Sequence, residues 1–540
     1  MGTSLRGAPQ RMAILAVADL KSLLPSACFF SAAVAMAALG PQGCGGNGRP
    51  DVGSGGAPAG VGSGGGPAGV GGAGVGSGGT STGSGGSNAG PGGSPGTGGS
   101  GVGAGGSSAG TGGSPAGTGG SPGSGGMSPG SGGTSARPDA SSTGSGGGSV
   151  IDAAALGDSG MPRVYGQENT GADCPKPALP AYAQLPTIDG LPDPFVSASG
   201  NRITSRADWR CRRAEISAMV QNYELGTKPA PPSNLTASFA ANTLTVNVTA
   251  GSGSLQLTAN VTLPSGAGPF PAVIGVATGG TAALPANIFT SRGIATVAFA
   301  DGQVAPQFPN RGQGAFYGLY PDPKVGSMIA WAWGISRIID GLEKTVSQTK
   351  IDLTHLAVTG CSYAGKIALY AGAFDERIAL TIPEESGGGG EAAWRVSGTM
   401  TGTEDLSHAQ GTAWYWQDLT QFNATPGKLP FDQHEVAAMV APRALLMIGN
   451  PDIAYLASEA GYVSAKAAIE VYKALGVPDR IGFTQVGGHA HCAFPAGQTA
   501  DVSAFVDKFL VGKDANTSVA VSPYSTDLSK WFTWSTPQLQ

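Results

Sequence analysis

A long glycine-rich tract confines any folded domain to the later part of this chain. Between residues 43 and 148 the sequence repeats units such as GGSPGTGGSG, and most of the 92 glycines among 540 residues lie in the first third. Such a tract has almost no aromatic or branched apolar side chains, so it cannot bury enough surface to offset its ordering entropy. We therefore predict a Gly/Ser/Pro-rich linker over residues 41–160 and a folded domain over residues 165–540.

The segment before the linker has the features of a secretory signal. Scattered basic residues precede the apolar stretch LLPSACFFSAAVAMAALG, which is rich in small residues toward its end. Pro25 leaves its uninterrupted apolar run shorter than the roughly 20 residues that a membrane span needs. We predict a signal peptide over residues 1–40. The mature protein is then secreted or tethered to the cell surface, with no transmembrane span.

The cysteines agree with export. Of the six in the chain, Cys28 lies in the signal and Cys44 heads the linker, where it is a candidate for a lipid anchor. An even number in an exported domain suggests two disulfides. The four cysteines of the domain are Cys174, Cys211, Cys361 and Cys492.

Composition and motifs also exclude several functions. The net charge is −5 and only 12% of the residues are charged, so no basic patch for nucleic acid is expected. No Cys or His cluster has the spacing of metal ligands, so we expect no metal site. We also expect no cofactor, and a monomer.

Short apolar runs and helical patterns alternate along the domain. Residues 242–250 and 254–264 alternate polar and apolar side chains around GSG, which predicts a hairpin exposed on one face. The runs FPAVIGVATGG, GIATVAFA, LAVTG and RALLMIGN are typical of parallel strands buried on both faces. Helical patterns at 326–344, 366–374 and 465–476 separate them. This order predicts an α/β fold, a doubly wound and mostly parallel sheet in a three-layer sandwich.

One serine lies where such a fold places a nucleophile. Residues 356–359 are a predicted strand, 360–365 a tight turn, and Lys366 begins a helix, so Ser362 lies above the carboxyl edge of the sheet. This is the place of the nucleophile elbow in α/β-hydrolases, and the amide of Tyr363 can face a developing oxyanion there. The spacing is G-x-S-x-x-G instead of G-x-S-x-G, so an ordinary turn serine stays an open alternative.

A nucleophilic serine needs a base and an acid. His489 and His491 occur in GGHAHCAFP, a loop after a predicted late strand, and one of them is the expected base. For the acid, Asp452 follows a late strand in LLMIGNPD, whereas Glu384 and Glu385 follow the strand after the serine. Reasoning from these positions alone favours Asp452.

From residue 174 to the end, the chain resembles the glucuronoyl esterases, carbohydrate esterase family 15. The resemblance implies an α/β-hydrolase fold and a serine esterase that needs no metal or cofactor. It also implies the substrate, which is the ester between 4-O-methyl-glucuronic acid on xylan and a lignin alcohol. The segments that carry it, in order, are DWRCRRAEI, AWAWGISRIIDGLE, VTGCSYAGK, ESGGGGEAAWR, LPFDQHEVAAMVAPRALL, ALGVPDRIGFTQVGGHAHCAFP and WFTWSTPQL.

The resemblance assigns roles to the catalytic residues. It makes Ser362 the nucleophile, His491 the base and Glu385 the acid, which overrides the preference for Asp452. The amide of Tyr363 would help to bind the oxyanion. It also implies two disulfides. These are Cys361 with Cys492, which ties the nucleophile turn to the base loop, and Cys174 with Cys211.

The substrate pocket departs from the family pattern. Tyr363 stands where the family usually has an arginine, and a neutral phenol is a weaker donor to an anion than a guanidinium. Losing such a donor costs on the order of 10² to 10³ in rate unless another group compensates. Lys366 matches a sugar-contacting lysine, Tyr455 falls near a sugar-contacting tryptophan, and Glu404 and Gln410 are candidates for two further contacts. Two alternatives therefore stay open, an esterase with shifted specificity and an inactive carbohydrate-binding homologue.

Overall fold

The computed structural model describes residues 165–540 except residues 278, 309 and 410–412. The predicted signal peptide, the linker with Cys44, and Gln410 lie outside the described residues. Among the described residues, no helix combines the length and apolar character that a bilayer crossing requires.

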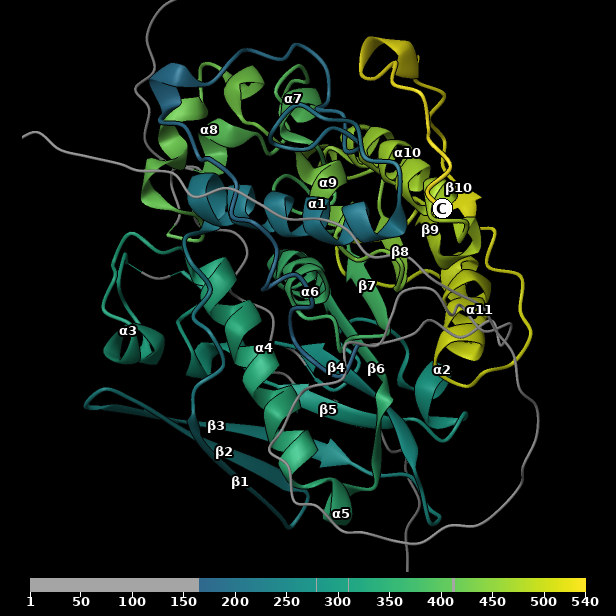
Figure 1. Ribbon diagram of the computed structural model, residues 1–540. Coiled ribbons are helices and arrows are strands. Elements are labelled where there is room, and N and C mark those ends of the chain that lie inside the picture. Colours follow the sequence, from purple (N-terminus) through teal and green to yellow (C-terminus); the bar gives the residue numbers. More distant parts are fainter. Residues whose placement is uncertain (1–164, 278, 309, 410–412) are drawn as a thin grey trace, which may run out of the picture. The chain divides into compact units, whose positions relative to one another are not determined.

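A single ten-stranded sheet organises the described chain, in the order β1-β2-β3-β5-β4-β6-β7-β8-β9-β10 (Figure 1). The first strands pair antiparallel, and from β5 through β4 to β10 all neighbours are parallel. The predicted hairpin is confirmed, because β2 and β3 pair antiparallel with their turn between Ala250 and Gly253. The strands are β1 Asn234–Ala240, β2 Thr243–Ala250, β3 Gly253–Thr262, β4 Phe270–Val276, β5 Ala295–Phe299, β6 Ile351–Cys361, β7 Leu380–Glu384, β8 Ala444–Gly449, β9 Ile481–Gln485 and β10 Ala520–Val521.

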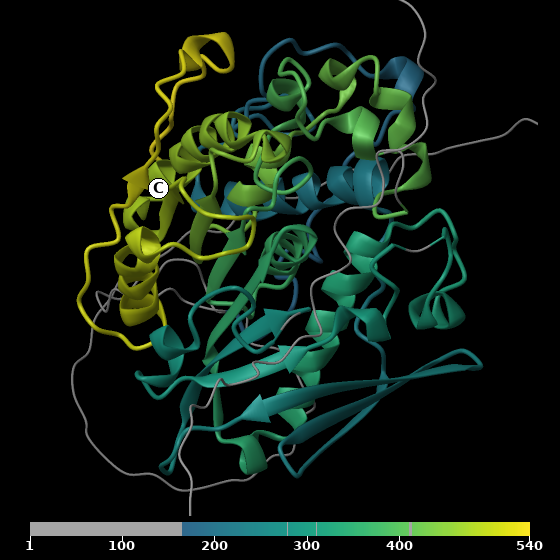
Figure 2. The same ribbon diagram turned by 180° about the vertical axis from the view of Figure 1, so that it is seen from behind.

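Helices cover both faces of this sheet, which confirms the α/β-hydrolase architecture (Figures 1 and 2). Side chains of β4 alternate between two cores: Ala272 and Ile274 join the core under α4 and α6, whereas Val273 joins the core under α2 and α11. A strand buried on both faces needs the nearly continuous apolar sequence seen here. The helices are α1 Arg206–Val220, α2 Ala286–Thr290, α3 Ala315–Leu319, α4 Ser327–Lys344, α5 Val346–Thr349, α6 Tyr363–Phe374, α7 Trp394–Ser397, α8 Leu406–Ala409, α9 Gln433–Ala438, α10 Ser458–Ala474 and α11 Thr499–Phe509.

The segment before α1 is fastened to the domain by a disulfide and by buried ion pairs. Cys174 is joined to Cys211 of α1, as predicted. Glu168 pairs with Lys228 and with Arg337 of α4, and the Arg337 side chain has no exposed surface. Because Arg337 is fully buried, the carboxylate of Glu168 is needed to offset part of the cost of burying its charge.

Candidate active site

Ser362 lies at a sharp turn between β6 and α6. Its φ of 62° and ψ of −127° are a conformation that a residue with a side chain rarely adopts, typical of a nucleophile elbow. The turn is held by the Ser362 amide, which donates to the carbonyl oxygen of Glu384 over 2.9 Å. Small neighbours are required here: a Cβ on Gly360 would lie 2.2 Å from the Ala364 oxygen. The apolar strand and the small residues around Ser362 therefore shape this turn together.

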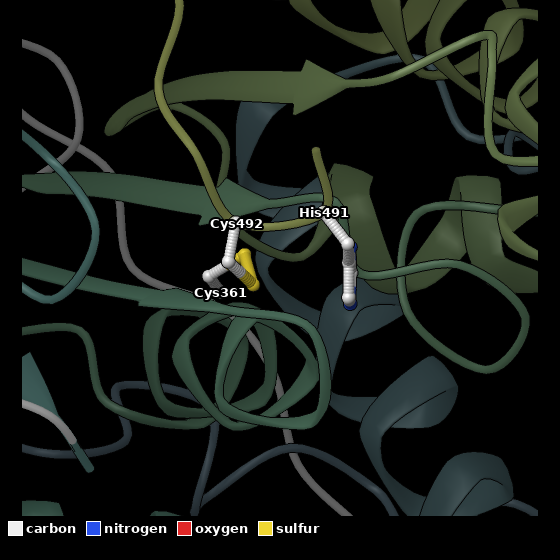
Figure 3. Close-up of side chains that lie close together, drawn as sticks. All are labelled: Cys361, His491 and Cys492. Carbon is white, nitrogen blue, oxygen red and sulfur yellow. A yellow bond between two sulfur atoms is a disulfide. The ribbon is translucent and has the colours of Figure 1, made fainter. Parts of the chain in front are cut away.

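A disulfide joins this turn to the loop after β9. Cys361 and Cys492 are bonded, as predicted, with their Cα atoms 5.8 Å apart. Figure 3 shows His491 beside this bridge. A ring nitrogen of His491 lies within 4.8 Å of both sulfur atoms. Both thiols are consumed in the bridge, so this group offers no thiolates to a metal ion. The bridge holds the residue before Ser362 against the residue after His491.

Glu385 is the carboxylate that contacts His491. Its Oε2 lies 2.6 Å from Nδ1 of His491 and also accepts a hydrogen bond from the amide of Cys492 over 3.1 Å. The Glu385 side chain is buried, whereas that of His491 is 39% exposed. A carboxylate bound at Nδ1 fixes the tautomer whose Nε2 is free to accept a proton. This is the arrangement that a general base requires.

The other two candidates, His489 as the base and Asp452 as the acid, are held in other ways. Nε2 of His489 lies 2.8 Å from the carbonyl oxygen of Val486, and its Nδ1 lies 3.0 Å from that of Ala490. Asp452 accepts a hydrogen bond from the Gly488 amide over 2.6 Å. Within the described residues Asp452 forms no ion pair with either histidine. It shapes the base loop instead, while the imidazole of His489 is held by the backbone, with its Nδ1 3.7 Å from Oε1 of Glu385, farther than that of His491.

Strand order explains why Glu385 meets the base. Glu385 follows β7, which lies next to β6, whereas Asp452 follows β8, one strand further away. The Cys361–Cys492 bridge draws the base loop back toward the end of β6. The loop therefore reaches the end of β7.

Three predicted sugar-contacting residues form one polar cluster, Lys366, Glu404 and Tyr455. Nζ of Lys366 lies 2.8 Å from Oε2 of Glu404 and also donates to the carbonyl oxygen of Ser386. The Glu404 amide donates to the carbonyl oxygen of Tyr455 over 2.7 Å. Lys366 and Glu404 are buried, whereas Tyr455 is 47% exposed. The cluster therefore presents a phenol to solvent above a buried ion pair.

Two further buried carboxyl groups surround Glu385, and only one of them was considered from the sequence. Burial raises the pKa of Glu384 far above its ordinary value, although Thr359 donates a hydrogen bond to it. Burial and the nearby charge of Glu385 raise the pKa of Glu391 to about 8. Both shifts favour the neutral form of these two carboxyl groups. Glu391 follows a run of four glycines, a pattern that gives no hint of this burial.

The side chain of Tyr363 is part of the wall beside the nucleophile. Its ring stacks on Trp414, with centroids 5.9 Å apart, and meets Trp331 edge to face. Its hydroxyl lies 3.5 Å from Oδ1 of Asp301, a buried group whose pKa is raised by desolvation. Desolvation also raises the pKa of Tyr363 itself, so the phenol stays neutral. Its amide is in the first turn of α6, where amides have no partner within the helix.

Comparisons with known proteins agree with this geometry. The family described as "Glucuronyl esterase, fungi" matches residues 246–476. A 4-O-methyl-glucuronoyl methylesterase of Hypocrea jecorina (strain QM6a) is 41% identical over 378 residues, which cover 68% of this chain and 80% of the relative. A second such methylesterase, from Sodiomyces alcalophilus, is 44% identical over 363 residues, which cover 65% of this chain and 71% of the relative.

Solved structures give the same result. The glucuronoyl esterase catalytic domain from Hypocrea jecorina is 42% identical, with a TM-score of 0.63 over 67% of this chain and 100% of that one. A mutant glucuronoyl esterase from Sporotrichum thermophile, in complex with methyl 4-O-methyl-β-D-glucopyranuronate, is 39% identical, with a TM-score of 0.63 over 66% and 97%. Sequence and structure together place this chain in the glucuronoyl esterase family.

Proposed function

We propose that this protein is a serine esterase that hydrolyses esters of 4-O-methyl-D-glucuronic acid. The observation that carries the proposal is the contact between His491 and Glu385 beside the strained turn at Ser362. The relatives named above are 4-O-methyl-glucuronoyl methylesterases, and one solved neighbour binds the methyl ester of this acid.

In the proposed reaction, Oγ of Ser362 attacks the ester carbonyl carbon while Nε2 of His491 takes the serine proton. The carbonyl π electrons move to the oxygen, and the Tyr363 amide stabilises that oxyanion at the start of α6. The tetrahedral intermediate collapses, the bond to the alkoxy oxygen breaks, and His491 returns its proton to the leaving alcohol. Water then attacks the acyl-enzyme by the same route and releases the uronic acid and Ser362. Glu385 orients the imidazole and stabilises its cationic form.

The polar cluster is the proposed site for the acyl half of the substrate. Lys366, Glu404 and Tyr455 would meet the hydroxyls of the uronate, with Gln410 as a further candidate. We propose glucuronoxylan as the carrier of the acid and a lignin alcohol as the leaving group. Every step uses side chains or backbone groups of the chain together with water, so this mechanism calls for no metal or cofactor.

We also propose that the protein acts as a monomer outside the cell, secreted or tethered at the surface, with Cys44 as the candidate lipid anchor. Its two disulfides support this location, because such bridges persist in oxidising compartments.

The environment of Tyr363 favours a second candidate function. With a phenol in place of the family arginine, packed against Trp414 and Asp301, the site lacks a charged oxyanion donor at this position. An esterase of the same fold with another ester specificity, or a homologue that binds carbohydrate without turnover, would fit that change.

Release of methanol from methyl 4-O-methyl-glucuronate by the full chain tests the proposal. We expect turnover that is lost in Ser362→Ala, with phenyl acetate as the comparison ester. Val346→Ala is the matched control, because Val346 is exposed and far from the candidate site. It lies in α5, before the amino end of β6, whereas Ser362 follows the carboxyl end of β6. Faster cleavage of the acetate than of the uronate would favour shifted specificity. A folded protein that cleaves neither ester would refute the proposed esterase activity on glucuronate esters.

A further inference from the structure

An aromatic row extends from the nucleophile turn to the surface. It consists of Tyr363, Trp414 and Phe308, and each neighbouring pair is stacked with ring centroids 5.9 Å apart and planes inclined by 25°. Tyr363 directly follows Ser362, so the row begins beside the reacting atoms. Phe308 ends it and is 73% exposed, the most exposed of the large hydrophobic side chains in the described chain. A single exposed apolar ring is common on protein surfaces, but this one continues a stack that begins at the residue after Ser362.

Phe308, at the outer end of the row, and Tyr455 of the polar cluster follow strands on opposite sides of β6, whereas Trp414 comes from the connection between β7 and β8, as Glu404 does. Phe308 belongs to the segment after β5, whereas Ser386 and Tyr455 of the polar side follow β7 and β8. In the sheet, β5 lies on one side of β6, and β7 and β8 lie on the other. The acyl and alcohol halves of an ester leave its carbonyl carbon in different directions. The two sides of β6 can therefore hold different halves of the substrate.

The chemistry of the row indicates which half of the ester substrate, acyl or alcohol, it can bind. Nε1 of Trp414 already donates to the carbonyl oxygen of Gln307 over 2.7 Å, and the Tyr363 hydroxyl faces Asp301. The row thus offers mainly the exposed ring of Phe308, because Trp414 is 9% exposed and stacks on both neighbours, and the polar atoms of the row are engaged. A sugar bound there would lose water from hydroxyls that find few partners. A ligand with an aromatic ring loses little, and it gains offset-stacked or edge-to-face contacts.

We propose that the aromatic row is a subsite for the aromatic ring of an aryl-substituted leaving alcohol, with Phe308 as a specificity-determining residue. This inference rests on the proposed function, because the row is tied to the reaction through Tyr363, which directly follows Ser362. The acyl half then lies toward the polar cluster, and the ring of the alcohol lies against Phe308 at the exposed end of the row. Tyr363, where the family usually has an arginine, continues the apolar surface up to the ester.

The test compares benzyl and methyl esters of the same glucuronic acid with the full chain. In Phe308→Ala we expect the ratio of kcat/KM for benzyl over methyl ester to fall about threefold to tenfold, mainly through KM. Phe308→Tyr keeps the ring and should keep the ratio, and Val346→Ala should leave it unchanged. An unchanged ratio in Phe308→Ala overturns the subsite. Equal loss on a methyl ester whose acid carries a xylo-oligosaccharide also overturns it, because the row would then hold sugar.

A second measurement separates the subsite from the esterase reaction. If the wild-type protein cleaves neither ester, the proposed function fails, and saturation-transfer NMR with 3-phenylpropan-1-ol decides about the row. Transfer to the aryl protons that is weaker in Phe308→Ala supports an aromatic site. No transfer to those protons in the wild type refutes it.

Discussion

Replacing Glu385 by glutamine tests the assignment of the acid most directly. The substitution keeps the shape of the side chain and an oxygen that can accept from Nδ1 of His491, which now lies 2.6 Å away, but it removes the negative charge. When His491 takes the serine proton, that charge lies about 4 Å from the centre of the imidazolium. At an effective dielectric constant of about 20, the attraction is about 4 kcal/mol. We therefore expect kcat/KM to fall about 10³-fold.

The assay is alcohol release from the methyl and benzyl glucuronates at saturating and limiting substrate. Asp452→Asn is the matched control, because it also neutralises a carboxylate, one that accepts from the Gly488 amide in the base loop. We expect it to lower kcat/KM by less than about tenfold, since it affects only the position of the loop. Near-normal turnover in Glu385→Gln together with a large loss in Asp452→Asn would refute the reasoning and return the role to Asp452.

Two further predictions concern stability. Glu168→Ala leaves the buried Lys228 and Arg337 without one of their carboxylates, so the free energy of unfolding in urea should fall by about 3 to 5 kcal/mol. Asp418→Ala breaks an exposed ion pair and should change the free energy of unfolding by less than about 1 kcal/mol. Equal losses in Glu168→Ala and Asp418→Ala would contradict the role of burial. Burial raises the pKa of Glu224 to about 8 in the folded protein. The folded state then binds the extra proton between about pH 4.5 and 8, so stability should decrease as pH rises through this window. Glu224→Gln should make the dependence of unfolding free energy on pH less negative by up to about 1.4 kcal/mol per pH unit, and an unchanged slope would contradict the shift.

Much of the fold could be predicted because its signals are local. Strands buried on both faces need continuous apolar runs, and these runs locate β4, β5 and β8, whereas β6 begins at Ile351, earlier than the predicted strand at 356–359. The turn at Ser362 is equally local, since the strand, the small residues and the helix that form it lie within one short segment. The disulfide pairings could not be predicted from local signals. The sequence shows an even number of cysteines in the domain, and only the family resemblance indicates which of them pair.

Local sequence patterns determined that a nucleophile could lie at the end of β6 and that a histidine could lie in the loop after β9. Tertiary structure decided which groups meet there. Glu385 rather than Asp452 contacts His491, because β7 is the neighbour of β6 and the Cys361–Cys492 bridge draws the base loop toward it. The aromatic row likewise joins three segments far apart in the sequence. Sequence patterns report how each segment buries its own side chains, whereas a site depends on which segments become neighbours across the sheet.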